Sequence, residues 1–323
     1  MDGIGNGIPL GDVGAGLPSY LSLYASGELA QRAEAAMAGL AACSLCPRRC
    51  RVNRLAGELG ACRSGALARV ASWNRHDWEE PPISGTRGSG TIFFSGCTGA
   101  CIFCQNYPIS HLNHGVDVLP ERLASMMLEL QARGCHNINL VTGTHFVPQV
   151  LAALVVAVPR GFRLPLVYNT SGYETVDTLR LLDGVVDVYL PDAKYADDAI
   201  AQRLSGFKRY VEANRAALRE MYRQVGHDLV LDREGIAVRG MIVRHLVLPG
   251  GLAGSPEVAY WLANNLSPKV HVSIMSQYFP AYRAVGDAQL GRKITREEYE
   301  AAVGAFVAAG LETGWQQEPE EAV

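Results

Sequence analysis

The sequence predicts an α/β protein whose core is a partial (β/α)6 barrel. Strand-like and helix-like segments alternate six times between residues 91 and 309, which is typical of parallel strands joined by right-handed crossovers. The expected strands are apolar on both faces, as in a sheet that helices cover. No G-x-G-x-x-G motif follows a strand, which makes a dinucleotide-binding sheet the weaker alternative.

The composition is typical of a soluble enzyme. Of 323 residues, 48% are hydrophobic and 19% are charged, with a net charge of −3, which gives no reason to expect a nucleic acid partner. No basic residue precedes Arg32, so no signal peptide is expected. The most apolar run, residues 146–159, is too short to span a bilayer. We therefore expect a cytoplasmic protein without membrane association, whose eight cysteines serve metal binding or catalysis rather than disulfides.

The segments before the alternating body differ in composition. Residues 1–26 are rich in glycine and are expected to be irregular, whereas residues 27–42 are rich in alanine and glutamate and predict a helix. The expected units are an irregular segment with a helix (1–42), a cysteine-rich metal-binding segment with a connector (43–89), the partial barrel (90–317) and a tail (318–323).

In the alternating body, the expected strands are short apolar runs, and the expected helices carry apolar residues at helical spacing. The strands are residues 91–95, 137–142, 164–169, 185–190, 241–248 and 270–275. The helices are residues 120–133, 147–157, 175–182, 255–265 and 295–309, with two more around Gly206 within residues 197–226. Pro120 and Gly134 mark the ends of the first helix, and Thr295 with Glu298 predicts a capping box at the last.

Three cysteines follow the first expected strand. Cys97, Cys101 and Cys104 have the spacing C-x3-C-x2-C, and thiolates this close on one loop can converge on a metal centre. A structural zinc site needs a fourth ligand nearby, but the next cysteine, Cys135, lies beyond an expected helix. Three ligands suit a [4Fe-4S] cluster with one iron open to a substrate. We favour this interpretation over a zinc loop or three unrelated buried thiols.

A second group of cysteines lies in the N-terminal part of the chain. Cys43, Cys46, Cys50 and Cys62 follow the pattern C-x2-C-x3-C-x11-C and supply four thiolates, enough for a closed metal site. Zinc and a second iron–sulfur cluster both accept such ligands. A structural role is favoured, because the segment has few apolar residues with which to build a core.

The connector that follows contains Glu79, Glu80, Pro81 and Pro82. The two prolines predict an extended path into the first barrel strand. A charged pair in this position usually belongs to a solvated loop. The alternative is that Glu79 or Glu80 faces the site, because the connector leads directly to the cysteine loop.

Polar residues stand at the carboxyl end of every expected strand. In barrels of parallel strands this edge carries the chemistry, so the pattern predicts a mouth that binds a charged, hydrogen-bonding ligand. The candidate ligand-binding residues are Thr142, Gly143, Thr144, Asn169, Thr170, Ser171, Asp192, Lys194 and Arg244.

Together these motifs resemble those of the radical S-adenosylmethionine (SAM) superfamily. Within it, the chain is most similar to the pyruvate formate-lyase-activating-enzyme-like family, which is related to the activases of glycyl radical enzymes. The resemblance covers residues 43–317 and implies a partial radical SAM barrel. It also implies that the three cysteines of the first loop bind a [4Fe-4S] cluster whose open iron chelates SAM. Phe103 fills the aromatic position before the third cysteine.

The resemblance further implies roles for the strand ends. Thr142-Gly143-Thr144 occupies the place of a Gly-Gly-Glu motif that holds the SAM amino group, and the glutamate is absent here. Residues 169–172 are similar to a segment near the ribose and methionine of SAM. Lys194, in an Asp-x-Lys motif with Asp192, is expected to bind the SAM carboxylate, and Arg244 is expected to reach the same ligand.

The implied activity is that of an oxidoreductase that cleaves SAM reductively to a 5′-deoxyadenosyl radical, which then abstracts hydrogen from a substrate. The substrate is expected to be a glycyl radical enzyme or another polypeptide. One alternative is a small-molecule substrate, and a second is a non-catalytic metal-binding scaffold. The expected partners are SAM, an electron donor such as flavodoxin or ferredoxin, and the protein substrate.

Overall fold

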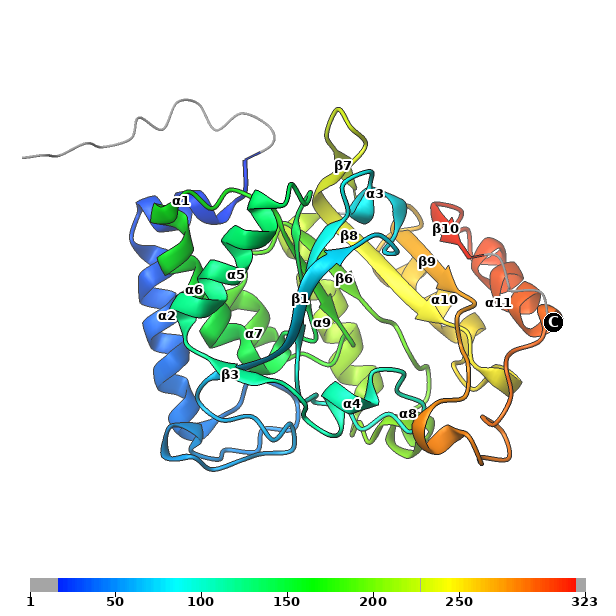
Figure 1. Ribbon diagram of the computed structural model, residues 1–323. Helices are drawn as coiled ribbons and strands as arrows, with labels where there is room; N and C mark the ends of the chain where they lie inside the picture. Colours follow the sequence, from blue (N-terminus) through cyan, green and yellow to red (C-terminus); the bar gives the residue numbers. More distant parts are fainter. Residues whose placement is uncertain (1–16, 227, 318–323) are drawn as a thin grey trace, which may run out of the picture.

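The computed structural model describes residues 17–226 and 228–317, which form one mixed sheet flanked by helices (Figure 1). Six parallel strands make up the body of this sheet, and each pairs with the next in chain order. They are β2 (Ser89–Phe94), β4 (Ile138–Val141), β5 (Leu166–Thr170), β6 (Val188–Pro191), β8 (Ala237–Leu246) and β9 (His271–Met275). The predicted alternation is confirmed, and the sheet is open rather than closed on itself.

Further strands extend the sheet at its edges. They are β1 (Ala68–His76) and β3 (Val116–Val118), both antiparallel to their neighbours, β7 (Val230–Leu231), which pairs with β8, and β10 (Gly314–Gln316), which runs parallel to β9. The connector thus contains a strand that the sequence did not predict. Ala68 and Val70 are buried on one face of β1 while the residue between them is partly exposed, which is the alternation of a half-buried strand.

The predicted extended path through Pro81 and Pro82 is wrong. These prolines occupy the first turn of a short helix, α3 (Pro81–Ser84). Proline fits there because the first turn of a helix has no use for its missing N–H donor. Glu80, the residue before the first proline, keeps a non-helical backbone with a ψ of 145°.

Helices flank the sheet close to the positions that the sequence predicts. They are α2 (Glu28–Ala38), α5 (Pro120–Ala132), α6 (Val147–Ala157), α7 (Val176–Leu181), α8 (Asp198–Ser205), α9 (Tyr210–Val225), α10 (Ser255–Asn265) and α11 (Arg296–Ala308). Gly206 separates α8 from α9 in the left-handed conformation, and the capping box of Thr295 and Glu298 forms at α11. No helix in residues 17–226 or 228–317 combines the length and the apolarity required to cross a membrane.

Besides α3, two further short helices were not predicted. These are α1 (Tyr20–Ala25), in a segment expected to be irregular, and α4 (Tyr107–Ser110), after the cysteine loop. The expectations for residues 1–16 and for the tail at 318–323 lie outside the described residues.

The main core lies around α6. Leu151 and Leu154 of this helix are fully buried, and α2 packs against α6 with Leu29 in the same core. Figure 1 shows α2, α5 and α6 together at one end of the sheet and α10 with α11 at the other. A smaller aromatic core contains Phe103 of the cysteine loop, whose ring meets that of Tyr278 edge to face at 5.7 Å.

Candidate functional site

The cysteine loop after β2 is anchored by its backbone. The N–H of Ala100 donates to the carbonyl of Ser205 at 2.8 Å, and the N–H of Ile102 donates to the carbonyl of Leu204 at 2.9 Å, both at the end of α8. The carbonyl of Ile102 accepts the N–H of Arg283 at 2.9 Å. These bonds fix the loop without using its cysteine side chains, which are left to face the pocket.

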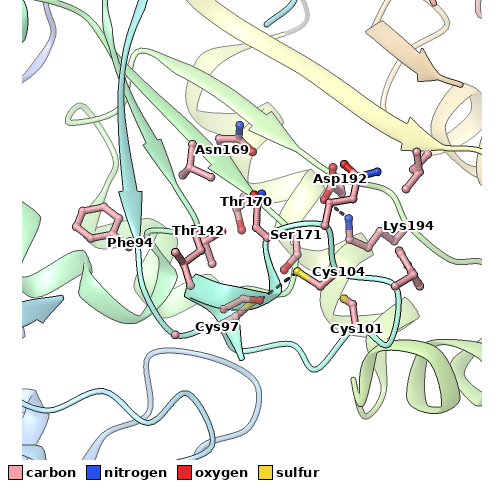
Figure 2. Close-up of a pocket in the computed structure, with 18 of the residues that line it drawn as sticks. Phe94, Cys97, Cys101, Cys104, Thr142, Asn169, Thr170, Ser171, Asp192 and Lys194 are labelled. Carbon is pink, nitrogen blue, oxygen red and sulfur yellow. Dashed lines mark hydrogen bonds and ion pairs between the residues drawn. The ribbon is translucent and has the colours of Figure 1, made fainter. Parts of the chain in front are cut away.

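The three thiols of the loop line one pocket (Figure 2). Cys97 accepts a hydrogen bond from the backbone N–H of Gly99 at 3.2 Å, and the Cys104 sulfur lies 3.1 Å from the Ser110 hydroxyl. Burial, together with the negative charge of the neighbouring Cys101 and Cys104 thiolates, raises the pKa of Cys97 to about 12. A cationic metal centre would offset this repulsion, so the donor set fits one.

The number of thiols in this pocket suits a cluster better than a structural zinc ion, which takes four protein ligands. Within residues 17–226 and 228–317, no three Cys, His, Asp or Glu side chains converge closely enough to hold one metal ion. Thiolates on a tetrahedral zinc lie about 3.8 Å apart, because each Zn–S bond is about 2.3 Å long. A [4Fe-4S] cluster accepts a wider spacing, since each thiolate binds a different iron.

Most of the polar residues that the sequence singles out lie in this pocket. The candidate residues in its lining are Cys97, Cys101, Phe103, Cys104, Thr142, Asn169, Thr170, Ser171, Asp192 and Lys194. Figure 2 shows the strand ends on one side of the pocket and the cysteines on the other. Gly143, Thr144 and Arg244 lie outside this lining.

Thr142 directly follows β4 and has an unusual backbone conformation. Its φ of 59° lies in the left-handed region, which a β-branched residue rarely adopts. The N–H of Thr142 donates to the carbonyl of Asn169 at 2.9 Å, which ties this turn to the next strand. Backbone strain of this kind is concentrated at functional sites, and Thr142 lies in the pocket lining.

Lys194 forms an ion pair with Asp192 inside the pocket (Figure 2). The two side chains are only 16% and 15% exposed, so water screens the pair weakly. Burial alone would lower the pKa of Lys194, but Asp192 and the Cys101 thiolate raise it above its usual value. An ammonium has three N–H donors, so Lys194 can bind an anionic ligand while it bonds Asp192.

Helix α9 holds the ends of β5 and β6 in place. The Asn214 amide donates to the carbonyl of Asp192 at 2.8 Å. The Tyr210 hydroxyl donates to the carbonyl of Ser171 at 2.9 Å and accepts the N–H of Lys194 at 3.0 Å. Sequence reasoning missed Tyr210 and Asn214, because they stand in an ordinary amphipathic helix and form no motif with the strand ends.

A buried carboxylate, Glu174, lies behind the pocket. It accepts hydrogen bonds from the hydroxyls of Thr144 at 2.5 Å, of Tyr168 at 3.4 Å and of Thr170. The hydroxyl hydrogen of Thr170 is used in this bond, and its oxygen also accepts the N–H of Gly172 at 3.3 Å, which leaves one lone pair for a donor in the pocket. Burial raises the pKa of Glu174 to about 7, although these three hydroxyls lower it in part.

Sequence reasoning missed Glu174 and interpreted Thr144 differently. Thr144 was expected to contact the ligand, but its hydroxyl bonds Glu174 behind the pocket lining. The sequence did contain a signal for Glu174. This carboxylate stands two residues after Gly172, the last residue of the polar segment at this strand end.

Arg244 also lies outside the pocket lining, in contact with the connector. Its guanidinium is 3.5 Å from a Glu79 oxygen and 3.3 Å from a Glu80 oxygen, and its backbone bridges to that of Asp192. Burial alone would lower the pKa of Arg244, but Glu80, Glu79 and Asp192 raise it. The interpretation of Glu79 and Glu80 as a solvated loop is wrong, since their side chains are 8% and 6% exposed.

The four N-terminal cysteines line a second pocket. The backbone N–H of Ala61 donates to the Cys50 sulfur at 3.5 Å. Burial is the main cause that raises the pKa of Cys46 to about 12, and the charges of Cys62 and Cys50 contribute to it. The four thiols therefore share one small volume.

Three arginines beside these cysteines have left-handed backbones. The φ angles are 42° at Arg49, 57° at Arg51 and 54° at Arg63, and each residue directly follows or precedes a cysteine. Residues other than glycine adopt this conformation rarely, and usually where the structure imposes it. The backbone is thus bent tightly around Cys50 and Cys62.

Arg54 is a buried cation next to the same thiols. It is 1% exposed, donates to the carbonyls of Gly65 at 2.6 and 2.9 Å and of His145 at 2.7 Å, and lies 3.8 Å from the Cys43 sulfur. A guanidinium stays charged in proteins. A buried charge needs compensation, and a metal centre with four thiolates is anionic.

The two cysteine groups belong to adjoining segments. The Arg48 guanidinium donates to the carbonyls of Thr98, in the first loop, and of Gly206. Gly96 has a φ of 78°, and a Cβ at this position would lie 2.5 Å from the carbonyl of Cys62. Only glycine therefore allows the N-terminal segment to pack this closely against the loop that carries Cys97.

The first parallel strand of this α/β sheet thus leads into three thiols that line a pocket with polar strand ends. Comparisons with known proteins show the superfamily to which the chain belongs. Residues 91–237 match the model of the radical SAM superfamily. Over 269 residues the chain is 33% identical to Uncharacterized protein MJ0674 of Methanocaldococcus jannaschii, covering 81% of this chain and 73% of that protein. The chain belongs to the radical SAM superfamily, whose enzymes bind SAM and an iron–sulfur cluster.

Solved structures with similar folds include a radical SAM methyltransferase from Sphaerobacter thermophilus, with a TM-score of 0.46 and 15% identity over 70% of this chain and 65% of that one. They also include HydG, a maturase of the [FeFe]-hydrogenase, with a TM-score of 0.46 and 10% identity over 68% and 48% of the two chains. Methylornithine synthase (PylB) has a TM-score of 0.45 and 12% identity over 72% of each chain. The chain thus spans less than two thirds of the first two proteins.

The raised pKa of Glu174 predicts a pH effect on stability. The folded state holds the proton more tightly than the unfolded state, so protonated Glu174 stabilises the fold below pH 4.5, and this contribution is lost as the pH rises through about 7. The shift corresponds to a loss on the order of 3 kcal/mol in the free energy of unfolding. Glu174→Gln should remove this loss, as measured by urea unfolding across that pH window.

The exposed Glu300 provides the matched control. Glu300→Gln should keep the pH dependence of the wild type. If the unfolding free energies of Glu174→Gln and the wild type fall in parallel, Glu174 does not titrate in the folded state as described.

Proposed function

We propose that this chain is a radical SAM enzyme that cleaves SAM reductively at a [4Fe-4S] cluster bound by Cys97, Cys101 and Cys104. The observation that supports it best is that these three thiols line one pocket together with the polar strand ends. Three thiolate ligands leave one iron of the cluster open. When bound, the cluster and SAM supply a 5′-deoxyadenosyl radical that removes a hydrogen atom from the substrate.

In this proposal the chain's own residues bind SAM and keep water from it. The Lys194 ammonium binds the SAM carboxylate, since it keeps free donors beside Asp192. Thr170 accepts a hydrogen bond from the SAM amino group or a ribose hydroxyl, because its own hydrogen is directed to Glu174. In its ionised form, which dominates above about pH 7, Glu174 thereby supplies from behind the pocket the negative charge that the absent glutamate of the Gly-Gly-Glu motif would give. Phe207, in the apolar part of the lining, limits the access of water.

We also propose a closed metal centre on Cys43, Cys46, Cys50 and Cys62. The shared pocket, the left-handed arginines and the buried Arg54 beside Cys43 support it. Both zinc and a second iron–sulfur cluster fit a donor set of four thiolates. An iron–sulfur centre here would adjoin the loop of the first cluster and could pass electrons to it.

We favour a small molecule as the substrate. The charged side chains of Glu79, Glu80 and Arg244 are enclosed on the face of the sheet that carries the pocket, where water has little access. A polypeptide such as a glycyl radical enzyme is the second candidate. The open sheet, which leaves one side without strands, and the resemblance to the pyruvate formate-lyase-activating-enzyme-like family favour it. In either case an external electron donor, such as flavodoxin or ferredoxin, reduces the cluster.

The first prediction from this proposal concerns the cluster. Replacement of Cys97, Cys101 and Cys104 by Ala should lower the iron content by about four atoms per chain and abolish formation of 5′-deoxyadenosine from SAM and dithionite, because no other three thiols would hold that cluster. Cys135→Ala, which removes a buried thiol far along the chain, is the control and should keep both. Continued 5′-deoxyadenosine formation by the triple variant would falsify the assignment of the cluster to these cysteines. A wild type that forms no 5′-deoxyadenosine would indicate a non-catalytic metal-binding scaffold.

The second prediction concerns SAM binding. Lys194→Ala should weaken SAM binding roughly 10- to 150-fold, because a charge-assisted contact contributes about 1.5–3 kcal/mol. The iron content should stay unchanged. Equilibrium dialysis with the anaerobic protein measures the dissociation constant, and Lys269→Ala, at an exposed lysine, is the control. Equal SAM affinity in the two variants would exclude Lys194 from the site.

The third prediction concerns the N-terminal cysteines. Elemental analysis of the wild type should find either about four iron atoms with about one zinc, or about eight iron atoms, per chain. Replacement of all four cysteines by Ala should remove only the additional metal and make this segment sensitive to protease, because a structural metal contributes on the order of 10 kcal/mol to folding. A wild type with four iron atoms and no other metal contradicts the closed centre.

A further inference from the structure

A cluster of buried polar side chains lies beside the SAM pocket that we propose. Arg244 of β8 pairs with Glu79 and Glu80, which reach it from the connector just before α3. The three side chains are 15%, 8% and 6% exposed. Asn139 of β4 is fully buried nearby. Burial raises the pKa of Glu79, and Arg244 and the Asn139 amide offset part of this effect, although the amide lacks the geometry of a hydrogen bond.

This cluster lies on the same face of the sheet as the pocket. Side chains two residues apart on a strand share a face, so Asn139 lies on the face of Val141, and Arg244 lies on the face of Leu246. Both Val141 and Leu246 line the pocket. Arg244 also pairs through its backbone with Asp192 of the lining. The cluster therefore forms the layer next to the pocket, further from the strand ends.

Several polar atoms of this cluster have no hydrogen-bond partner within residues 17–226 and 228–317. They are Oε2 of Glu80 and both amide atoms of Asn139. A buried polar atom left without a partner costs about 1–3 kcal/mol, and each such atom requires a partner. Glu80 offers an acceptor, and Asn139 offers an acceptor, its Oδ1, and the two N–H donors of its amide nitrogen.

The charge of the cluster identifies the chemistry of that partner. When both are ionised, Glu79 and Glu80 carry one more negative charge than Arg244 neutralises, and Lys194 is already paired with Asp192. The remaining titratable neighbour, His76, is 3.7 Å from Glu79 and adds a positive charge only when protonated. An ammonium group supplies both the missing charge and N–H donors for Glu80 and Asn139.

We propose that Glu80 and Asn139, with Glu79 beside them, bind the amino group of a small-molecule substrate that carries a primary amine. Arg244 holds the two carboxylates in place and is a positioning residue. This inference rests on the proposed function, because the subsite lies next to the pocket in which we place SAM. It differs from the sequence interpretation, in which Arg244 itself binds SAM.

The test uses butylamine as the probe and butanol, which has the same chain without the charge, as its comparison. The iron-loaded full chain is unfolded thermally under anaerobic conditions at constant pH and ionic strength. Butylamine should raise the unfolding temperature with an apparent dissociation constant on the order of 1 mM, the range that a ligand with so few atoms can reach. Butanol should have no such effect.

Two variants locate the binding. Glu80→Gln, which keeps the shape and loses the charge, should weaken the butylamine effect at least tenfold, and so should Asn139→Ala. The exposed Glu300→Gln should behave like the wild type. If either subsite variant unfolds at assay temperature, the other still decides.

Arg244→Lys, which keeps a cation without the paired donors, should reduce the butylamine effect less than Arg244→Ala, as a positioning role requires.

The outcomes separate this inference from the proposed function. SAM cleavage without stabilisation by butylamine would overturn the amine subsite and leave the radical SAM assignment intact. Stabilisation that Glu80→Gln abolishes, in a protein that does not cleave SAM, would support the amine site and remove the proposed reaction. Equal stabilisation of the wild type and both subsite variants would place butylamine elsewhere and overturn the inference.

Discussion

A loop that gives its side chains to a metal cluster must be held by its backbone, and the candidate site of this protein depends on that constraint. The loop with the three thiols receives its support from α8 through Ser205 and Leu204, and from the turn at Arg283. Both lie more than a hundred residues further along the chain. Gly99 packs against the ring of Phe207, where a Cβ would approach to 2.7 Å. The geometry of the thiols is therefore a property of the whole fold.

The charged side chains around the pocket are likewise held in place by their neighbours. Lys194 and Arg244 are enclosed cations, and each is paired with carboxylates that raise its pKa against the effect of burial. Such pairs stay charged with little water around them, so a bound ligand meets fixed charges rather than mobile solvent. Glu174 acts one layer behind, by fixing the direction of the Thr170 hydroxyl. Fixed charges therefore line and adjoin the pocket before any ligand enters.

Much of the fold and of the candidate site could be predicted from the sequence, because it depends on patterns of residues that are close together in the chain. The six parallel strands could be predicted because each is an apolar run between helical segments. The two cysteine motifs could be predicted because their cysteines are close together in the sequence. Strand β1 escaped prediction because its alternation is weak and its partner, β2, comes later in the chain. The pairing of Arg244 with Glu79, 165 residues apart, could not be predicted, since it arises only when the sheet brings β8 to the connector. Glu174 was missed because a carboxylate near a strand end is usually exposed.

Electron paramagnetic resonance of the dithionite-reduced protein, recorded with and without SAM, tests the central claim most directly. In the proposed site, SAM bound to the open iron would change the electronic environment of a cluster held by Cys97, Cys101 and Cys104. We expect the signal of this cluster to shift when SAM is added, and any signal of a closed N-terminal centre to stay unchanged. A cluster signal that is identical with and without saturating SAM would contradict the account.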